Sequence, residues 1–141
     1  MIGWIRRPIH TFFSDARRPT KGTPFAGTEG SKILPELKQA ASDHVVFKKR
    51  YSAFYGTGLD DLLAALGARA LVIGGINTHA CVRTTVIDAY QRDYEVTLAS
   101  ECIGSYDAEH HDITVRYLDG QIARLSSNAD IIERLRSIPA D

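Results

Sequence analysis

The segment of residues 70–85 constrains the fold most strongly. An apolar run at 70–74 ends in a glycine pair, and Asn77 and Thr78 then precede residues with a helical pattern. This order predicts a buried parallel strand that turns tightly into a helix. Cys81 is therefore expected in the first helical turn, where free backbone N–H groups and the helix dipole favour a thiolate. The alternative is that Cys81 serves as a small buried hydrophobe, as free cysteines often do.

Predicted strands and helices alternate along the rest of the chain. Strands are expected at residues 3–7, 44–48, 94–99 and 121–126, with loop over the remainder of the first thirty residues. Helices are expected at residues 31–41, 58–67, 78–92, 107–118 and 127–138. This alternation predicts a parallel sheet covered on both faces, which is a three-layer αβα, Rossmann-like α/β fold. The 141 residues form one domain, of which 1–26 are a divergent, loop-rich N-terminal part.

Composition limits the expected partners. Seventeen basic and seventeen acidic residues cancel, so no overall field attracts nucleic acid or an anionic membrane. No run approaches the roughly 18 apolar residues of a membrane span, and the N-terminus lacks the apolar run of a signal peptide. We therefore expect a cytoplasmic protein whose partner is a small molecule or a second copy of the chain.

A lysine and several aromatic residues lie close together in the sequence after the strand at 44–48. Lys48 ends that strand, and open α/β sheets bind ligands at the carboxyl ends of their strands. The alternative is that residues 48–50 are a solvated, basic strand exit. The following segment is too aromatic for an ordinary surface loop, so Tyr51, Phe54 and Tyr55 are predicted to form a pocket wall.

Several motifs together resemble the isochorismatase-like cysteine hydrolases over residues 27–135. They are GTEG at 27–30, LPEL at 34–37, KKRYSAF at 48–54, GTGL at 56–59 and GGINTHACVRTT at 74–85, which runs into Asp88 and Ala89. The resemblance implies a cysteine hydrolase that cleaves a C–N bond of a small amide or ureido compound through a covalent acyl-enzyme. It also implies the parallel sheet of that family.

Residue roles follow from the same resemblance. Cys81 matches the nucleophile and Lys48 the lysine of the catalytic triad, with Lys49 as an alternative. The family's non-proline cis peptide would fall at Ile76-Asn77. The N–H groups of Asn77 and Cys81 would then form an oxyanion hole. Tyr51, Phe54 and Tyr55 would line the substrate pocket.

The chain departs from the family at its start. Members begin with a central strand that ends in the aspartate base, followed by a helix, and Asp15 is a poor match for that aspartate. Glu101, His79 or a residue of another subunit are the other candidate bases. Loss of a central strand exposes two unpaired ladders, which favours a homo-oligomer. The alternative function is a catalytically impaired binding or subunit-interaction module.

The remaining candidates are expected to be structural. No metal and no cofactor is expected, because His10 is the only early histidine. His110 and His111 are adjacent on a helix, where they point about 100° apart and are best explained as solvated charge. Cys102 is expected to be a buried free thiol, with a regulatory disulfide to Cys81 as the alternative.

Overall fold

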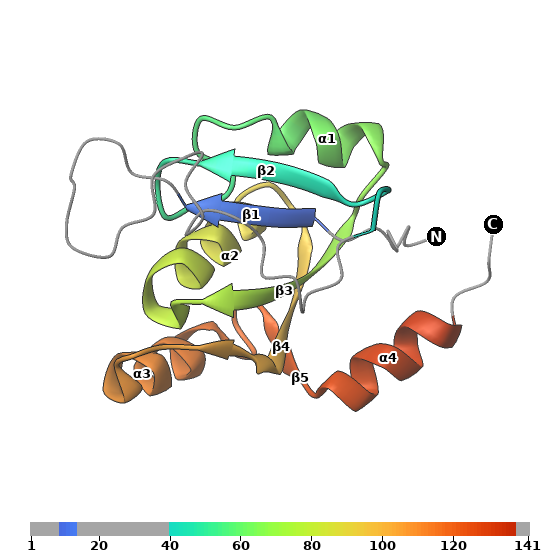
Figure 1. The fold of residues 1–141 in the computed structure, drawn as a ribbon. Coiled ribbons are helices and arrows are strands. Elements are labelled where there is room, and N and C mark those ends of the chain that lie inside the picture. Colours follow the sequence, from blue (N-terminus) through green and yellow to red (C-terminus); the bar gives the residue numbers. More distant parts are fainter. Residues whose placement is uncertain (1–8, 14–39, 138–141) are drawn as a thin grey trace.

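The computed structural model describes residues 9–13 and 40–137, and the bounds of its elements follow in chain order (Figure 1). The strands are β1 (Ile9–Phe13), β2 (His44–Lys48), β3 (Ala70–Ile76), β4 (Glu95–Gly104) and β5 (Arg124–Ser126). The helices are α1 (Leu59–Ala65), α2 (Arg83–Tyr90), α3 (Ala108–Leu118) and α4 (Asn128–Ser137), with a π-helical turn at Thr78–Val82 before α2. Alternating strands and helices give the expected α/β fold.

The strands form two parallel sheets. β1 pairs with β2, with Ile9 opposite His44, and the other sheet has the order β3-β4-β5. The arrows of β1, β2 and β3 point the same way in Figure 1. Within the described ranges no strand lies between β1 and β3. This arrangement agrees with the prediction of a family sheet that lacks its central strand.

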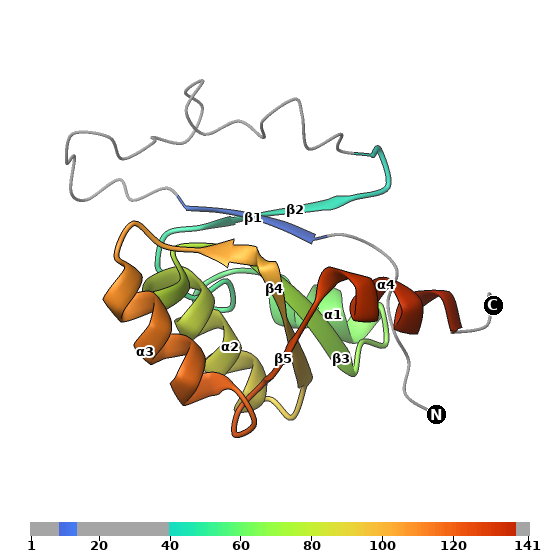
Figure 2. The ribbon, with the colours of Figure 1, turned by 90° about the horizontal axis from the view of Figure 1, so that it is seen from below.

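Helices cover both faces of β4. Val96 and Leu98 belong to the core cluster together with Val86 and Ala89 of α2. Thr97 points the opposite way, toward α4, which packs against β4 (Figure 2). β4 is therefore buried on both sides from Val96 to Ala99, as a central strand of a three-layer α/β fold should be.

One hydrophobic core joins the helices to the loop that follows β2. Its largest fully buried apolar side chains are Leu63, Leu98, Leu118 and Val86. Burying one such side chain contributes about 1.5–3 kcal/mol relative to leaving it exposed. Ala53 and Phe54 of the loop belong to the same cluster. The loop after β2 is thus part of the hydrophobic core and not only a surface loop.

The N-terminal prediction was wrong where the structure tests it. Residues 9–13 form β1, although this part was predicted to be loop; its sequence, IHTFF, consists mostly of residues that favour strands. The strand expected at 3–7 lies outside the described residues. Of the helix expected at 31–41 only Ala40 and Ala41 are described, and they lie at a turn in which the Asp43 carboxylate accepts the Ala40 N–H at 2.9 Å.

Pairing extends two strands beyond their predicted ends. β3 reaches Ile76 and β4 reaches Gly104, because Gly75 and Ile76 pair with Ile103 and Gly104 after an irregularity in the register. Cys102 therefore lies in a strand, and it is exposed rather than buried as expected. β5 is shorter than predicted, since Gly120 takes a left-handed conformation in a turn that precedes the strand.

α3 and α4 each bury only part of their apolar residues. Ile113 and Ile132 are exposed. In α3 the inward positions are Thr114 and Leu118, which are four residues apart and share one face. Ile131 is the buried residue of α4. None of the helices in the described part of the chain is long and apolar enough to cross a membrane.

Candidate active site

Cys81 lies on a π-helical turn immediately after β3. The strand ends at Ile76, and the Ile76-Asn77 peptide bond is cis, as the family resemblance implied. The Asn77 carbonyl accepts the Ala80 N–H at 3.1 Å and the Val82 N–H at 3.2 Å, which closes the turn. Cys81 was expected in the first turn of an α-helix, but that helix begins only at Arg83. The thiol is partly exposed and is not in a disulfide.

A buried hydroxyl ties the start of this turn to α3. Thr78 is fully buried, and its Oγ1 lies 2.9 Å from Nδ1 of His111. A buried hydroxyl is costly unless it has a hydrogen-bond partner, so this contact stabilises the turn in its observed position. Sequence reasoning missed this role of His111. The signal was its spacing, because 111, 114 and 118 fall on the buried face of one helix.

Lys48 is a buried amine at the carboxyl end of β2. Its side chain is 4% exposed, whereas the neighbouring Lys49 is exposed. The Lys48 Nζ donates hydrogen bonds to the carbonyls of Arg50 at 3.2 Å and Tyr51 at 3.1 Å. Burial lowers the pKa of Lys48, while the charge of Cys81 and a hydrogen bond with its side chain act in the opposite direction. The structure therefore brings Lys48 and Cys81 together.

The aromatic segment after Lys48 is divided between surface and core. Tyr51 and Tyr55 are exposed and remain candidates for contact with a ligand. Phe54 is 3% exposed and packs in the core, with the Arg92 guanidinium 4.6 Å from its ring centroid. The expected place of Phe54 in a pocket wall was therefore wrong. An aromatic ring serves equally well to anchor a loop, and the sequence pattern did not distinguish the two uses.

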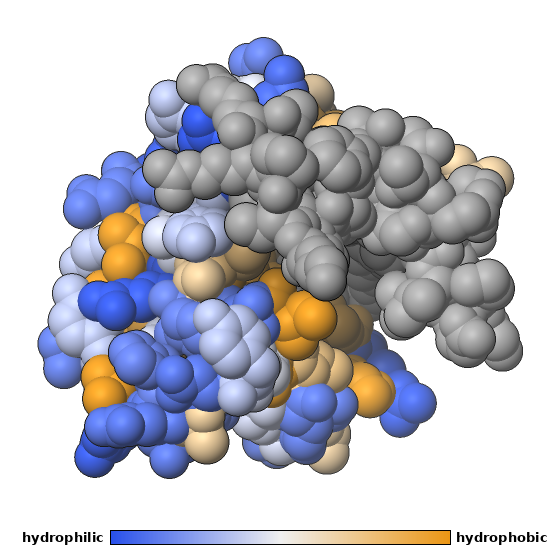
Figure 3. Space-filling view, turned by 60° about the vertical axis from the view of Figure 1, so that its left-hand side comes forward, coloured by the Kyte–Doolittle hydropathy of each residue, from blue (hydrophilic) through white to orange (hydrophobic). Residues whose placement is uncertain are grey.

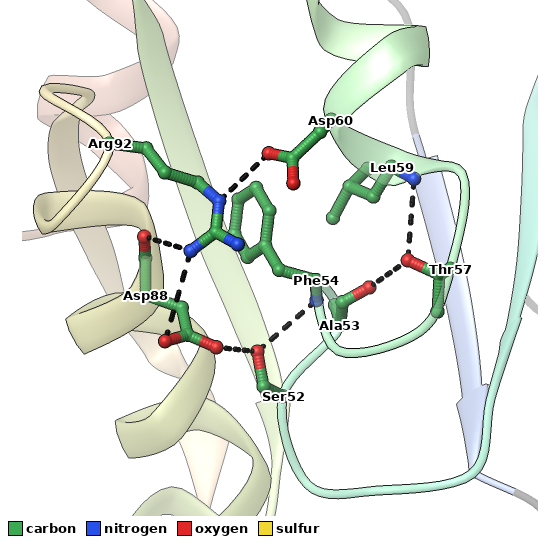
Figure 4. A network of polar contacts seen from close by, with 8 residues as sticks. All are labelled: Ser52, Ala53, Phe54, Thr57, Leu59, Asp60, Asp88 and Arg92. Atoms are coloured by element: carbon green, nitrogen blue, oxygen red, sulfur yellow. Dashed lines mark hydrogen bonds and ion pairs between the residues drawn. The ribbon is translucent and has the colours of Figure 1, made fainter.

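A polar network holds the same loop against α1 and α2 (Figure 4). Ser52 donates to the Asp88 carboxylate and accepts the Phe54 N–H at 3.1 Å. Arg92 bonds to Asp60 at 2.8 Å and to the Asp88 carbonyl at 3.0 Å. Ser52 is buried, so its hydrogen bonds satisfy a hydroxyl that water does not reach. The network fixes the loop whose carbonyls hold the Lys48 amine.

The expected alternative bases have other partners. Glu101 accepts from the Ser100 hydroxyl at 2.6 Å and from the Asn128 N–H at 2.9 Å, and these bonds lower its pKa. The Nδ1 of His79 lies 2.6 Å from the Ser105 hydroxyl, and its ring packs edge-on against Tyr106. Asp15 lies outside the described residues.

The two adjacent histidines of α3 have separate partners. His110 bonds to Asp107, the N-cap of the helix, whereas His111 bonds to Thr78. Across residues 9–13 and 40–137 no group of three or more His, Cys, Asp or Glu side chains is placed to hold a metal ion.

Fold and site together define a class: an α/β protein with a partly exposed thiol beside a buried amine, each following the carboxyl end of a parallel strand. Residues 5–130 match the model of the isochorismatase domain. The chain belongs to the isochorismatase family.

Two relatives and two solved structures illustrate this membership. The chain is 32% identical to the uncharacterized isochorismatase family protein YaaI of Bacillus subtilis, over 72% of this chain and 57% of that protein. It is 30% identical to maleamate amidohydrolase of Pseudomonas putida, over 78% and 53% respectively. An isochorismatase-like hydrolase from Alkaliphilus metalliredigens superposes with a TM-score of 0.85 at 27% identity, over 92% and 72%. Nicotinamidase from Bacillus subtilis gives 0.74 at 26% identity, over 86% and 75%.

The chain covers only part of the length of these relatives. The chain spans 57% of YaaI and 36% of enterobactin synthase component B of Escherichia coli, to which it is 28% identical over 74% of its own length. Family membership therefore rests on shared fold and sequence, and activity is a separate question.

Proposed function

We propose that this chain is a cysteine hydrolase that cleaves the C–N bond of a small amide or ureido compound through an acyl-enzyme on Cys81. The observation that carries the proposal is the buried Lys48 amine, on whose pKa the charge of the partly exposed Cys81 and a hydrogen bond with its side chain act. A nearby cation lowers the pKa of a thiol and increases the fraction of reactive thiolate. Two of the proteins compared above are by name amide hydrolases, which supports the choice of reaction.

The reaction divides into two balanced steps. The Cys81 sulfur attacks the carbonyl carbon, the C–N bond breaks, and the proton of the thiol leaves with the amine. Water then adds to the thioester, which releases the acid and restores the thiol. The N–H groups of Asn77 and Cys81 are proposed to stabilise the oxyanion, which is typically the largest electrostatic contribution in acyl transfer.

We base the choice of a polar substrate on the described surface at the carboxyl ends of the strands. With the side of the carboxyl ends of β1, β2 and β3 turned forward, the described surface is mostly hydrophilic and apolar atoms emerge in small separate groups (Figure 3). Tyr51 and Tyr55 are exposed in the loop that follows Lys48 and are proposed to contact the substrate. A small-molecule substrate, a homo-oligomeric state and a cytoplasmic location remain proposals.

Alkylation of Cys81 with iodoacetamide tests the thiolate directly. Its rate is measured against pH, and mass spectrometry of the peptides separates Cys81 from the exposed Cys102. We expect rapid modification of Cys81 near pH 7 that falls in Lys48→Met. Lys49→Met is the matched control, because Lys49 is exposed and should leave the rate unchanged. An ordinary thiol rate in the unmodified protein would contradict the proposal.

Turnover is tested by release of ammonia from a panel of small primary amides and ureido compounds. Wild type should release ammonia and Cys81→Ser should not. The alternative function is an impaired binding or subunit-interaction module, which the missing strand between β1 and β3 in the described part favours. Loss of a general base typically costs 10² to 10⁴-fold in rate, so a module is indicated only if single-turnover acylation of Cys81 is also absent.

A further inference from the structure

Thr85 joins the segment that carries Cys81 to the loop that holds Lys48. It lies in the first turn of α2, four residues after Cys81. Its hydroxyl donates a hydrogen bond to the Cys81 carbonyl at 2.7 Å and accepts the Ala53 N–H at 3.1 Å. One oxygen atom therefore bonds to both parts of the candidate active site.

The connection from Ala53 to Lys48 is short. The carbonyls that accept from the Lys48 amine belong to Arg50 and Tyr51, which lie three and two residues before Ala53. Ser52 and Ala53 are buried, so this part of the loop is packed and not free to drift. A shift of Ala53 away from α2 would carry the two carbonyls, and with them the amine, away from the thiol.

We propose that Thr85 is a positioning residue that sets the separation between the Lys48 amine and the Cys81 thiol. The inference rests on the proposed function, because it explains how the thiolate and its cation are held in register. Asp88 supplies a second anchor nearly one turn further along α2 through its hydrogen bond with Ser52. Through these two residues, hydrogen bonds hold the loop against one face of α2.

Thr84 provides a matched control. Its hydroxyl donates to the Ala80 carbonyl at 2.7 Å and approaches the Cys81 carbonyl at 3.4 Å, so both contacts stay within the helical segment. Thr84→Val and Thr85→Val each remove a helix back-bond of similar length and keep a β-branched side chain. Only Thr85→Val also removes the acceptor of the Ala53 N–H.

The experiment measures the pH profile of Cys81 alkylation in the full chain, with Cys102 as the reference thiol. Thr85→Val should slow modification near pH 7 by about fivefold, the factor that corresponds to a hydrogen bond of about 1 kcal/mol. Thr85→Ser should restore the rate, and Thr84→Val should match wild type. Equal effects of Thr84→Val and Thr85→Val, or no effect of either, would overturn the inference.

A double variant separates positioning from general destabilisation. If Thr85 acts through Lys48, then Thr85→Val should have no further effect on the Cys81 rate in a Lys48→Met protein, so the two changes are non-additive. Additive effects would contradict the proposal. If Lys48→Met itself leaves the profile unchanged, the proposed function fails; if Lys48→Met shifts it and Thr85→Val does not, only the role of Thr85 fails.

A variant-free measurement covers the case in which Thr85→Val does not fold. In wild type, the Ala53 amide should exchange with deuterium far more slowly than the amide of Tyr55, two residues along the same loop. Exchange of both amides at the same rate would show that the Thr85 hydrogen bond does not hold the loop, and would overturn the inference.

Discussion

Thr78 and His111 form a 2.9 Å contact between the π-helical turn and α3. Thr78 follows Asn77 directly and is fully buried, whereas His111 is partly exposed. The start of the segment that carries Cys81 is thereby fixed to a helix that is distant in sequence. The candidate oxyanion groups depend on the position of this turn, so α3 contributes to the site without facing a substrate.

Replacement of His111 should destabilise the protein more than replacement of its neighbour. His111→Leu leaves the buried Thr78 hydroxyl without this partner, at a cost of about 1–3 kcal/mol in the free energy of unfolding. His110→Leu is the control, since His110 is largely exposed and bonds only with the cap residue Asp107. Urea denaturation of both variants gives the comparison, and equal midpoints would contradict a structural role for the Thr78 contact.

Gly74 should not tolerate a side chain. A Cβ atom at this position would lie 3.0 Å from the Cys102 carbonyl oxygen and 3.1 Å from the Cys102 Cβ, so the backbone of β4 would have to shift by a few tenths of an ångström. Gly74→Ala should therefore lower the free energy of unfolding by about 1–3 kcal/mol. Gly104→Ala in the paired strand is the control, because its Cβ would meet only Ile76 at 3.7 Å. Thermal unfolding that ranks the two variants the other way would show that β4 moves aside.

Lys48 should make stability rise with pH at the alkaline end. Burial lowers the pKa of Lys48 below 10.5 in the folded chain, so between the folded and unfolded values the unfolded state binds more protons. The free energy of unfolding should then increase with pH through that window. The comparison is between Cys81→Ser and Cys81→Ser with Lys48→Met, which removes thiol titration from both. A difference that does not change as pH 10.5 is approached would contradict the burial of the amine.

Asp107 should make stability rise with pH in the same direction, but at the acid end of the range. Its carboxylate accepts the His110 N–H at 2.9 Å, and this bond lowers the pKa of Asp107 below 3.8. The stabilisation is complete above that value and is lost as pH falls through the folded pKa. Asp107→Asn keeps a side chain that caps helices well but cannot titrate. The advantage of wild type in chemical denaturation should shrink below pH 3.8, and a constant difference would exclude a role for the charge.

Much of the fold was predictable because its signals are local. The apolar runs at 44–48 and 70–74 mark real strands, and the helix predicted at 127–138 is present as α4, where the Ser127 hydroxyl accepts the Asp130 N–H at 3.1 Å. The extension of β4 to Gly104 was not predictable, because it depends on pairing with Gly75 and Ile76 and not on the residues of β4 alone. β1 was missed because its run IHTFF follows Pro8 directly and includes the polar His10 and Thr11, so it does not stand out as an apolar strand.

The candidate site was predictable at Cys81 and Lys48 and unpredictable around them. Lys48 and Lys49 are equivalent in sequence, and only tertiary packing buries the first and exposes the second. A threonine inside a helix gives no sign that its hydroxyl has a distant partner, so Thr85 was missed. Phe54 was assigned to a pocket because an aromatic cluster looks the same whether it faces a ligand or a core.

The division of the strands between two sheets places Lys48 and Cys81 at the ends of strands from different sheets. Lys48 is the last residue of β2, which pairs with β1. Cys81 follows β3, the first strand of the other sheet. The proposed pair thus joins the two sheets of the molecule. A displacement of one sheet along the other would change the distance between Lys48 and Cys81, and with it the reactivity of the Cys81 thiol. The rate at which Cys81 is modified would therefore report how closely the two sheets are packed.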